Sequence, residues 1–140
     1  MEVKLFTNHK AKRYIKKLFK NKLLHEEEYN IINRWDDETR DVKCYSLCEK
    51  DKIKNIVLLS KCDYDPEKKH SNPFILDYIY TFPEYRRNNL AYGMLLYIKK
   101  KEQVSAFCDS KESEKLFKKA EYIVTNCDSM MFGGSLFRFP

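Results

Sequence analysis

The sequence contains no apolar run that approaches the ~20 residues of a membrane-spanning helix, which predicts that the chain does not cross a membrane. Its first residues lack the apolar core of a secretory signal, so we expect an intracellular protein of the cytoplasm or nucleus that is not secreted. Cysteine occurs five times but never as a Cys-x-x-Cys pair, and the odd number predicts reduced thiols. Only three glycines occur, and no internal repeat or low-complexity tract is visible.

The composition is that of one folded domain spanning residues 1–140. Hydrophobic residues make up 43% and aromatic residues 14% of the chain, which excludes general disorder. Charged residues reach 34%, as expected of a soluble protein, and 140 residues are enough to bury a substantial core.

The net charge of +6 comes from the N-terminal segment. Residues 1–23 hold eight basic side chains and one acidic side chain, whereas the rest of the chain is slightly acidic. A helix in this segment would present a broad basic face formed by Lys12, Arg13, Lys16, Lys17 and Lys20. Such a face can bind nucleic acid or another anionic surface, or it can simply be a solvated helix exterior.

Periodicity and turn residues predict the element order β-α-α-β-β-β-α-β-α-β-β. The expected strands are 2–7, 42–49, 53–61, 74–82, 103–108, 122–126 and 131–139. The expected helices are one capped by Asn8 with apolar residues from Ala11 to Leu23, then 25–34, 89–101 and 111–120. A hairpin turn is expected at 50–52, an acidic loop from Asp36, and a polar loop at 63–73.

The most informative stretch is the turn between the strand 74–82 and the helix that follows it. Pro83 ends the apolar run, and a short basic segment then leads into the helical pattern. The first turn of a helix carries unpaired N–H groups and the positive end of the helix dipole. This arrangement predicts a binding site for an anion such as a phosphate.

The same turn resembles the acyl-CoA-binding signature of the GNAT superfamily of N-acetyltransferases. That signature reads Pro-x-x-Arg/Gln-x-x-Gly-x-Gly/Ala, and this chain has Pro83-x-x-Arg86-Arg87-Asn88-Asn89-Leu90-Ala91. Asn89 replaces the first glycine, and asparagine tolerates left-handed backbone angles better than most residues. The element order is also that of the GNAT fold. The resemblance implies an α/β (α+β) fold with a mixed, mostly antiparallel sheet flanked by helices.

The resemblance further implies acetyl-CoA as cosubstrate. The pantetheine arm would pair with the strand end as an added strand, and the turn would surround the pyrophosphate. The residues expected to contact acetyl-CoA are Ile79, Tyr80, Thr81, Arg86, Arg87, Asn88, Asn89, Leu90, Ala91 and Tyr92. No metal site is expected, because Cys44 and Cys48 would lie about 13 Å apart on one strand, too far to share a zinc ion.

The sequence offers two candidate catalytic residues, Asp77 and Tyr122. Asp77 is a carboxylate in an otherwise apolar strand and could act as a base, as could a water molecule, or it could be a structural residue at a strand bulge. Phe117 occupies the position at which many members of the GNAT superfamily carry a tyrosine that acts as the general acid. Tyr122 could serve as a displaced acid or could be a core tyrosine.

Two functions are compatible with these features. The first is an N-acetyltransferase that moves an acetyl group from acetyl-CoA to a primary amine by direct attack. The alternative is a GNAT-like binding module without catalytic groups, which uses the basic N-terminal helix for nucleic acid or a protein partner. The sequence does not identify the acceptor.

Overall fold

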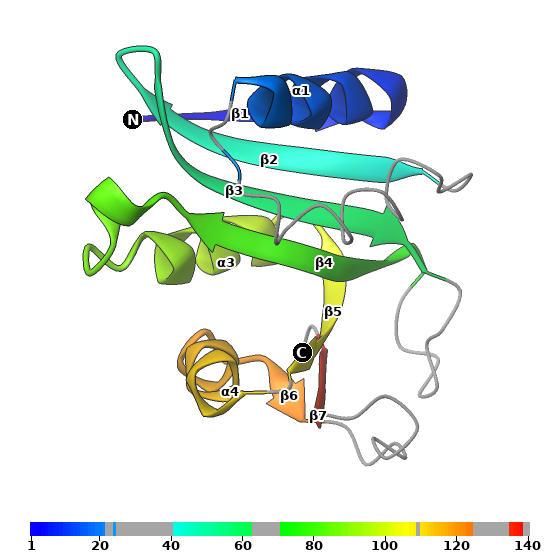
Figure 1. Ribbon diagram of the computed structural model, residues 1–140. Helices are drawn as coiled ribbons and strands as arrows, with labels where there is room; N and C mark the ends of the chain where they lie inside the picture. The colour runs from blue at the N-terminus through cyan, green and yellow to red at the C-terminus, as the bar shows by residue number, and fades with distance from the viewer. Residues whose placement is uncertain (22–23, 25–40, 63–70, 109, 125–134, 139–140) are drawn as a thin grey trace.

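A seven-stranded sheet forms the centre of the molecule in the computed structural model (Figure 1). The structure describes residues 1–21, 24, 41–62, 71–108, 110–124 and 135–138. The strands are β1 (Glu2–Thr7), β2 (Val42–Glu49), β3 (Lys52–Lys61), β4 (Pro73–Thr81), β5 (Gln103–Cys108), β6 (Ile123–Val124) and β7 (Ser135–Arg138). The described helices are α1 (Asn8–Lys20), α3 (Leu90–Lys99) and α4 (Lys111–Lys119), and the described 3-10 turn is η2 (Pro83–Tyr85).

The strands lie in the order β1-β2-β3-β4-β5-β7-β6. All neighbouring pairs are antiparallel except β4 and β5, which are parallel. The mixed, mostly antiparallel sheet expected from the sequence is therefore confirmed. Within the described residues the predicted element order holds, and the predicted strand 103–108 coincides with β5. The predicted helix 25–34, residues 36–40 of the predicted acidic loop and most of the predicted loop 63–73 lie outside the described residues.

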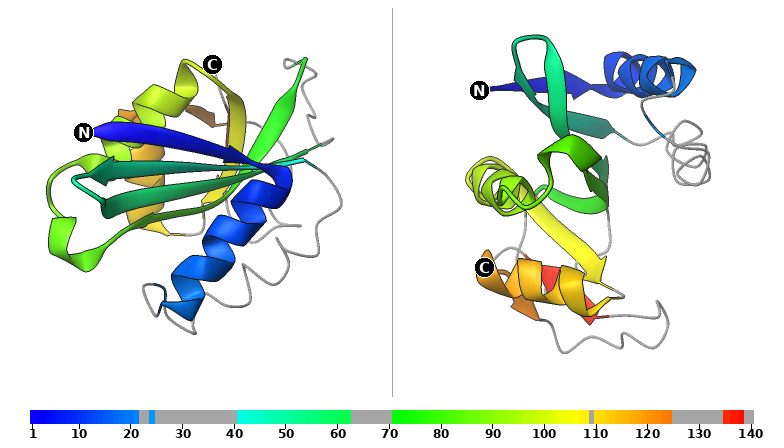
Figure 2. Two further views of the ribbon diagram at one scale, coloured as in Figure 1. Left: turned by 90° about the horizontal axis from the view of Figure 1, so that it is seen from above. Right: turned by 60° about the vertical axis from the view of Figure 1, so that its left-hand side comes forward.

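The sheet separates two hydrophobic cores. One core packs α1 against β2 and β3 through Ala11, Ile15, Leu18 and their partners. The other packs α3 and α4 against the opposite face of the sheet, with Leu95, Ile98 and other apolar side chains at its centre. Figure 2 shows α1 and α3 on opposite sides of the sheet. Alternating residues of β2 and β3 point to opposite faces, which is why both strands are apolar along most of their length.

The start of α1 differs from the expectation that Asn8 caps the helix. Thr7 is the N-cap residue and makes no side-chain capping bond, whereas Asn8 is left-handed with φ of 50°. Asn8 accepts a hydrogen bond through Oδ1 from the Val42 N–H at 3.0 Å. The chain passes from β1 into α1 without a linker, so the sharp bend falls on a residue that tolerates positive φ. The Asn8 side chain therefore ties the helix start to β2 instead of capping the helix.

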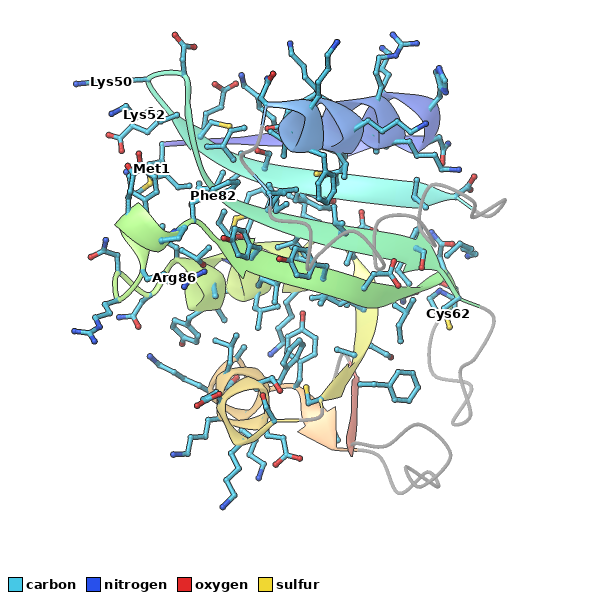
Figure 3. The ribbon with its side chains drawn as sticks, in the orientation of Figure 1. Met1, Lys50, Lys52, Cys62, Phe82 and Arg86 are labelled. Carbon is cyan, nitrogen blue, oxygen red and sulfur yellow. The ribbon has the colours of Figure 1, made fainter. Side chains whose placement is uncertain are left out.

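The β2–β3 hairpin closes with a two-residue turn, one residue shorter than expected. Glu49 and Lys52 are opposite each other, and the intervening Lys50 and Asp51 have φ of 49° and 66°. Positive φ at both positions matches the twist of the flanking strands. Lys50 and Lys52 extend from the tip of this hairpin (Figure 3).

Candidate functional site

Strand β4 parts from its neighbour β5 after a short stretch of pairing. The two strands are paired only from Pro73 to Ile75, opposite Gln103 to Ser105, although β4 continues to Thr81. Among the described residues, no strand pairs with the β5-facing edge of β4 beyond Ile75. Backbone N–H and C=O groups on such an edge can pair with an extended ligand in the way that an added strand would.

A β-bulge in β4 lies just beyond the point where the strands part. Leu59 pairs with Leu76 and Leu58 pairs with Tyr78, which leaves Asp77 as the additional residue. A bulge bends its strand and increases the local twist, and this bend accompanies the separation of β4 from β5. Asp77 is half-buried at this position. The bulge foreseen for a structural Asp77 is thus present, and the role of Asp77 as a base stays a prediction.

The turn between β4 and α3 contains two left-handed residues. Asn89 is the N-cap of α3 with φ of 56° and ψ of 27°, as expected for a residue that replaces the family glycine. Arg87 also has a positive φ, of 71°, and nothing in the sequence indicated this. The first hydrogen bond of the helix runs from the Gly93 N–H to the Asn89 carbonyl at 3.0 Å. The N–H groups of Leu90 to Tyr92 precede that bond and point out of the helix end.

Arg86 holds this turn against the end of β4. Its Nε donates to the Thr81 carbonyl at 3.0 Å, and its guanidinium carbon lies 5.4 Å from the centre of the Tyr80 ring. The amide of Asn88 donates to the Tyr85 carbonyl at 3.2 Å. Arg86 lies at the strand end, as Figure 3 shows, so it fixes the shape of the turn in addition to contributing positive charge.

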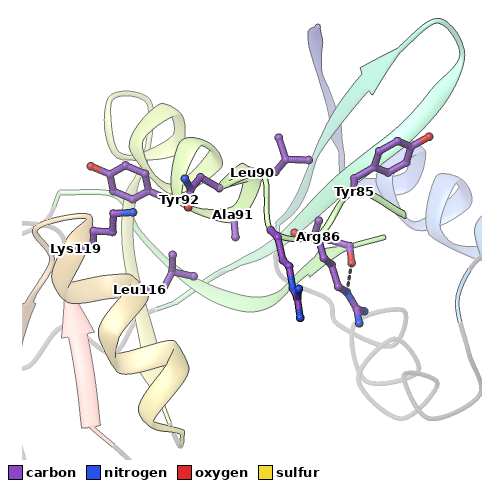
Figure 4. Close-up of a pocket in the computed structure, with 10 residues that line it drawn as sticks. Tyr85, Arg86, Leu90, Ala91, Tyr92, Leu116 and Lys119 are labelled. Atoms are coloured by element: carbon purple, nitrogen blue, oxygen red, sulfur yellow. Dashed lines mark hydrogen bonds between the residues drawn. The ribbon is translucent and has the colours of Figure 1, made fainter. Parts of the chain in front are cut away.

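An open pocket of about 230 Å³ lies at this turn, between α3 and α4 (Figure 4). Its lining residues are Thr81, Tyr85, Arg86, Arg87, Asn89, Leu90, Ala91, Tyr92, Leu116 and Lys119. Three of these side chains are cationic and none is a carboxylate. Seven of the residues expected from the sequence thus lie together, whereas Ile79, Tyr80 and Asn88 do not line the pocket.

Three lining residues were not expected: Tyr85, Leu116 and Lys119. The Lys119 Nζ lies 4.4 Å from the centre of the Tyr92 ring, which places a cation from α4 on the opposite wall from Arg86 (Figure 4). In the sequence Lys119 is one of two lysines in the last turn of an amphipathic helix, where cations also stabilise the helix end. The sequence does not place Lys119 at the pocket, because that position depends on the packing of α4 beside α3.

Tyr122 and Phe117 lie in the core that includes α3 and α4. Their rings meet edge to face with centres 5.1 Å apart, and Tyr122 is 4% exposed. Burial raises the pKa of the Tyr122 hydroxyl well above its usual value. The hydroxyl has no hydrogen-bond partner among the described residues, and neither ring lines the pocket. The role of Tyr122 as an acid stays a prediction.

The remaining predicted features lie away from the pocket. In the predicted basic face of α1, Arg13, Lys16, Lys17 and Lys20 are exposed and Lys12 is half-buried, and nucleic-acid binding by this face stays a prediction. Within the described ranges, no group of three His, Cys, Asp or Glu side chains could hold a metal ion. The four described cysteines are unbridged, and burial raises the pKa of Cys44. Cys127 lies outside the described residues.

No described helix is both long and apolar enough to span a membrane.

Comparison with known proteins identifies the fold. No family model and no curated protein matches the sequence. An N-acetyltransferase of Bacillus subtilis solved with coenzyme A superposes with a TM-score of 0.63 at 13% identity, covering 99% of this chain and 97% of that chain. Another acetyltransferase of Bacillus subtilis, also solved with CoA, gives 0.61 at 12% identity, covering 98% and 96%. A protein from Desulfovibrio desulfuricans assigned to the GNAT family of acetyltransferases gives 0.64 at 9% identity, covering 98% of both chains. At these identities the likeness establishes a shared fold.

Proposed function

We propose that this chain, which has the fold of the GNAT acetyltransferases, transfers an acetyl group from acetyl-CoA to a primary amine by direct attack. One observation carries the proposal: the turn at the start of α3, whose first N–H groups can hold an anion, lies beyond the end of β4, whose edge β5 leaves unpaired. A ligand with a diphosphate at one end and an amide-containing arm at the other needs both features side by side.

The residues present fit acetyl-CoA. The diphosphate would lie at the N–H groups of Leu90 to Tyr92, with Arg87 and Lys119 supplying positive charge from two elements. The pocket of about 230 Å³ is of a size for the phosphates and not for the whole molecule. The pantetheine arm would therefore extend along β4 and pair with the backbone of residues 79–81.

The acetyl group of bound acetyl-CoA is activated as a thioester, and the acceptor amine must lose its proton before it can attack. We assign that proton to the Asp77 carboxylate. Asp77 lies about 13 Å from Thr81 along the strand, at ~3.3 Å per residue, so a ligand anchored at the turn extends toward it. We keep the Tyr122 hydroxyl as the proposed proton donor to the departing thiolate, a role that rests on the sequence alone because this hydroxyl is buried and does not line the pocket.

Calorimetric titration with acetyl-CoA tests the proposal, followed by measurement of thiol release with a set of primary amines. We expect saturable binding and a rise in melting temperature. Arg87→Gln should weaken binding by roughly tenfold or more, because a charged contact to phosphate is lost. Arg13→Gln removes the same charge from the exposed face of α1 and should leave binding unchanged.

Two results would contradict the proposal. Absence of both heat and thermal shift at millimolar CoA would remove acetyl-CoA as a ligand. Equal weakening by Arg87→Gln and Arg13→Gln would mean that the net positive charge attracts the anion and that the turn does not.

A further inference from the structure

Asn55 is a fully buried amide in the middle of the sheet. It lies in β3, is 0% exposed, and is followed by the apolar residues Ile56 to Leu59. Its Nδ2 donates to the Thr81 Oγ1 at 2.7 Å. Its Oδ1 is also buried, and no described residue forms a hydrogen bond with it.

Stability alone does not explain an amide at this position. A buried carbonyl oxygen without a partner lowers stability, whereas an apolar side chain of similar shape would avoid that cost. Asn55 is also opposite Thr81 in the β3–β4 pairing, at the last residue of β4. This points to a role of the Asn55 amide at Thr81, the residue with which it forms a hydrogen bond.

Thr81 is held from two directions at the wall of the pocket. Its carbonyl accepts from Arg86 Nε at 3.0 Å, and its hydroxyl oxygen accepts from Asn55. A threonine hydroxyl has one proton and can accept at its lone pairs. Because the Asn55 amide donates, the Thr81 hydroxyl keeps its proton for another acceptor. Thr81 lines the open pocket, where an oxygen of a bound ligand can accept that proton.

We infer that Asn55 is a positioning residue that orients the Thr81 hydroxyl as a hydrogen-bond donor to an oxygen of the bound ligand. The inference rests on the proposed function, in which that ligand is an acyl-CoA and the oxygen belongs to a pantetheine carbonyl or to the diphosphate. Oxygens of both kinds accept hydrogen bonds and have no proton to donate. A Thr81 hydroxyl fixed as a donor would favour such an acceptor.

A double-variant cycle measured by titration with acetyl-CoA tests this inference. Thr81→Val removes the hydroxyl with little change of shape, and Asn55→Leu removes the amide in the same way. Each should weaken binding roughly 3- to 10-fold, the effect of one neutral hydrogen bond. The double variant should bind no more weakly than Thr81→Val, because both changes remove the same contact. Thr81→Ser keeps the hydroxyl and should bind like the parent protein.

Stability separates this role from a structural one. Asn55→Leu should unfold at the same or a higher urea concentration than the parent protein, yet bind acetyl-CoA more weakly. If the leucine is not accommodated, Asn55→Ala provides the same test with a smaller side chain. Repeating the titrations with ADP distinguishes the two oxygens: a loss seen with both ligands assigns the contact to the diphosphate, and a loss confined to acetyl-CoA assigns it to pantetheine.

Unchanged binding by Thr81→Val, or additive losses in the double variant, would overturn the inference while the proposed function stands. A parent protein that does not bind acetyl-CoA would overturn both.

Discussion

The Lys43 Nζ lies 2.7 Å from the Glu102 Oε1, and the Tyr45 hydroxyl donates to the same oxygen at 2.7 Å. The Glu102 side chain is only 7% exposed. Glu102 lies between α3 and β5, and both of its partners lie on β2, so the contact joins the end of α3 to a strand that β3 and β4 separate from β5 in the sheet order. It fixes the C-terminal end of α3, the helix whose other end forms the pocket.

Glu102→Gln should lower the free energy of unfolding by roughly 1–3 kcal/mol, because Lys43 would keep its charge in a partly buried position without a carboxylate. Urea denaturation measures the change. The pair of Lys54 and Glu49 on the hairpin is the matched control, since the Glu49 side chain is 42% exposed. Glu49→Gln should lower stability much less than Glu102→Gln, because solvent screens an ion pair at the surface. Equal losses in the two variants would show that the buried contact contributes no more than a surface ion pair.

The left-handed backbone at Asn89 makes opposite predictions for two substitutions. Asn89→Gly should keep or raise stability, because glycine adopts positive φ without a steric cost. Asn89→Val should lower the free energy of unfolding by about 1–2 kcal/mol, since a β-branched side chain disfavours this region. Thermal melting and acetyl-CoA titration of both variants provide the measurements. A glycine variant that binds acetyl-CoA much more weakly would mean that the asparagine side chain itself contacts the ligand.

Burial gives Tyr14 a distinct pH dependence. Desolvation raises the pKa of Tyr14 from 10.0 to about 12, and its hydroxyl lies 2.8 Å from the Ser46 Oγ. The folded state therefore keeps the proton longer than the unfolded state. The stabilisation is complete below pH 10 and is lost as the pH rises from 10 to 12.

At pH 8, Tyr14→Phe should melt at a lower temperature than the parent protein, because the hydrogen bond with Ser46 is lost. Between pH 10 and pH 12 its melting temperature should decrease less than that of the parent protein, because phenylalanine cannot ionise. Melting curves across this range make the comparison. Tyr45, Tyr122 and Cys44 also have raised pKa values, but they remain in both proteins and affect both curves alike. Parallel curves would contradict the assignment to Tyr14.

Much of the fold could be predicted because its signals are local. Alternating apolar residues gave β5 at its observed bounds, and Pro83 ended β4 within one residue of the prediction. The left-handed Asn89 followed from the requirement of the turn for a residue that accepts positive φ. These features depend on a few neighbouring residues, so a single sequence is sufficient to find them.

The features that were missed depend on contacts between distant segments. Asn8 looked like a helix cap, but its side chain bonds to Val42, which is 34 residues away. Lys119 reaches the pocket only because α4 packs beside α3. Asn55 is one of several polar residues in the predicted strand 53–61, and its bond to Thr81 requires the β3–β4 register. Spacing within one element does not encode any of these contacts.

Tyr122 can be tested by removing one atom. Because its buried hydroxyl has no hydrogen-bond partner among the described residues, Tyr122→Phe should keep or slightly raise stability. As the proposed acid, its loss should lower turnover by about 10- to 100-fold or more while acetyl-CoA affinity is kept. Steady-state rates and titration of the same variant measure both effects. Full turnover by Tyr122→Phe would mean that solvent protonates the thiolate and that Tyr122 is a core residue.

Asp77 is the residue that decides how the amine is activated. A half-buried carboxylate at a bulge can either accept the proton of the ammonium group or hold the bulge in shape. As the base, Asp77→Asn should reduce turnover by ~10²- to 10⁴-fold and leave acetyl-CoA affinity nearly unchanged, because the amide keeps the shape but cannot take the proton. The remaining activity should rise with pH as the free amine becomes more abundant. A structural Asp77 would instead show a lower melting temperature with normal turnover in the folded fraction. That result would leave water as the base and remove Asp77 from the mechanism.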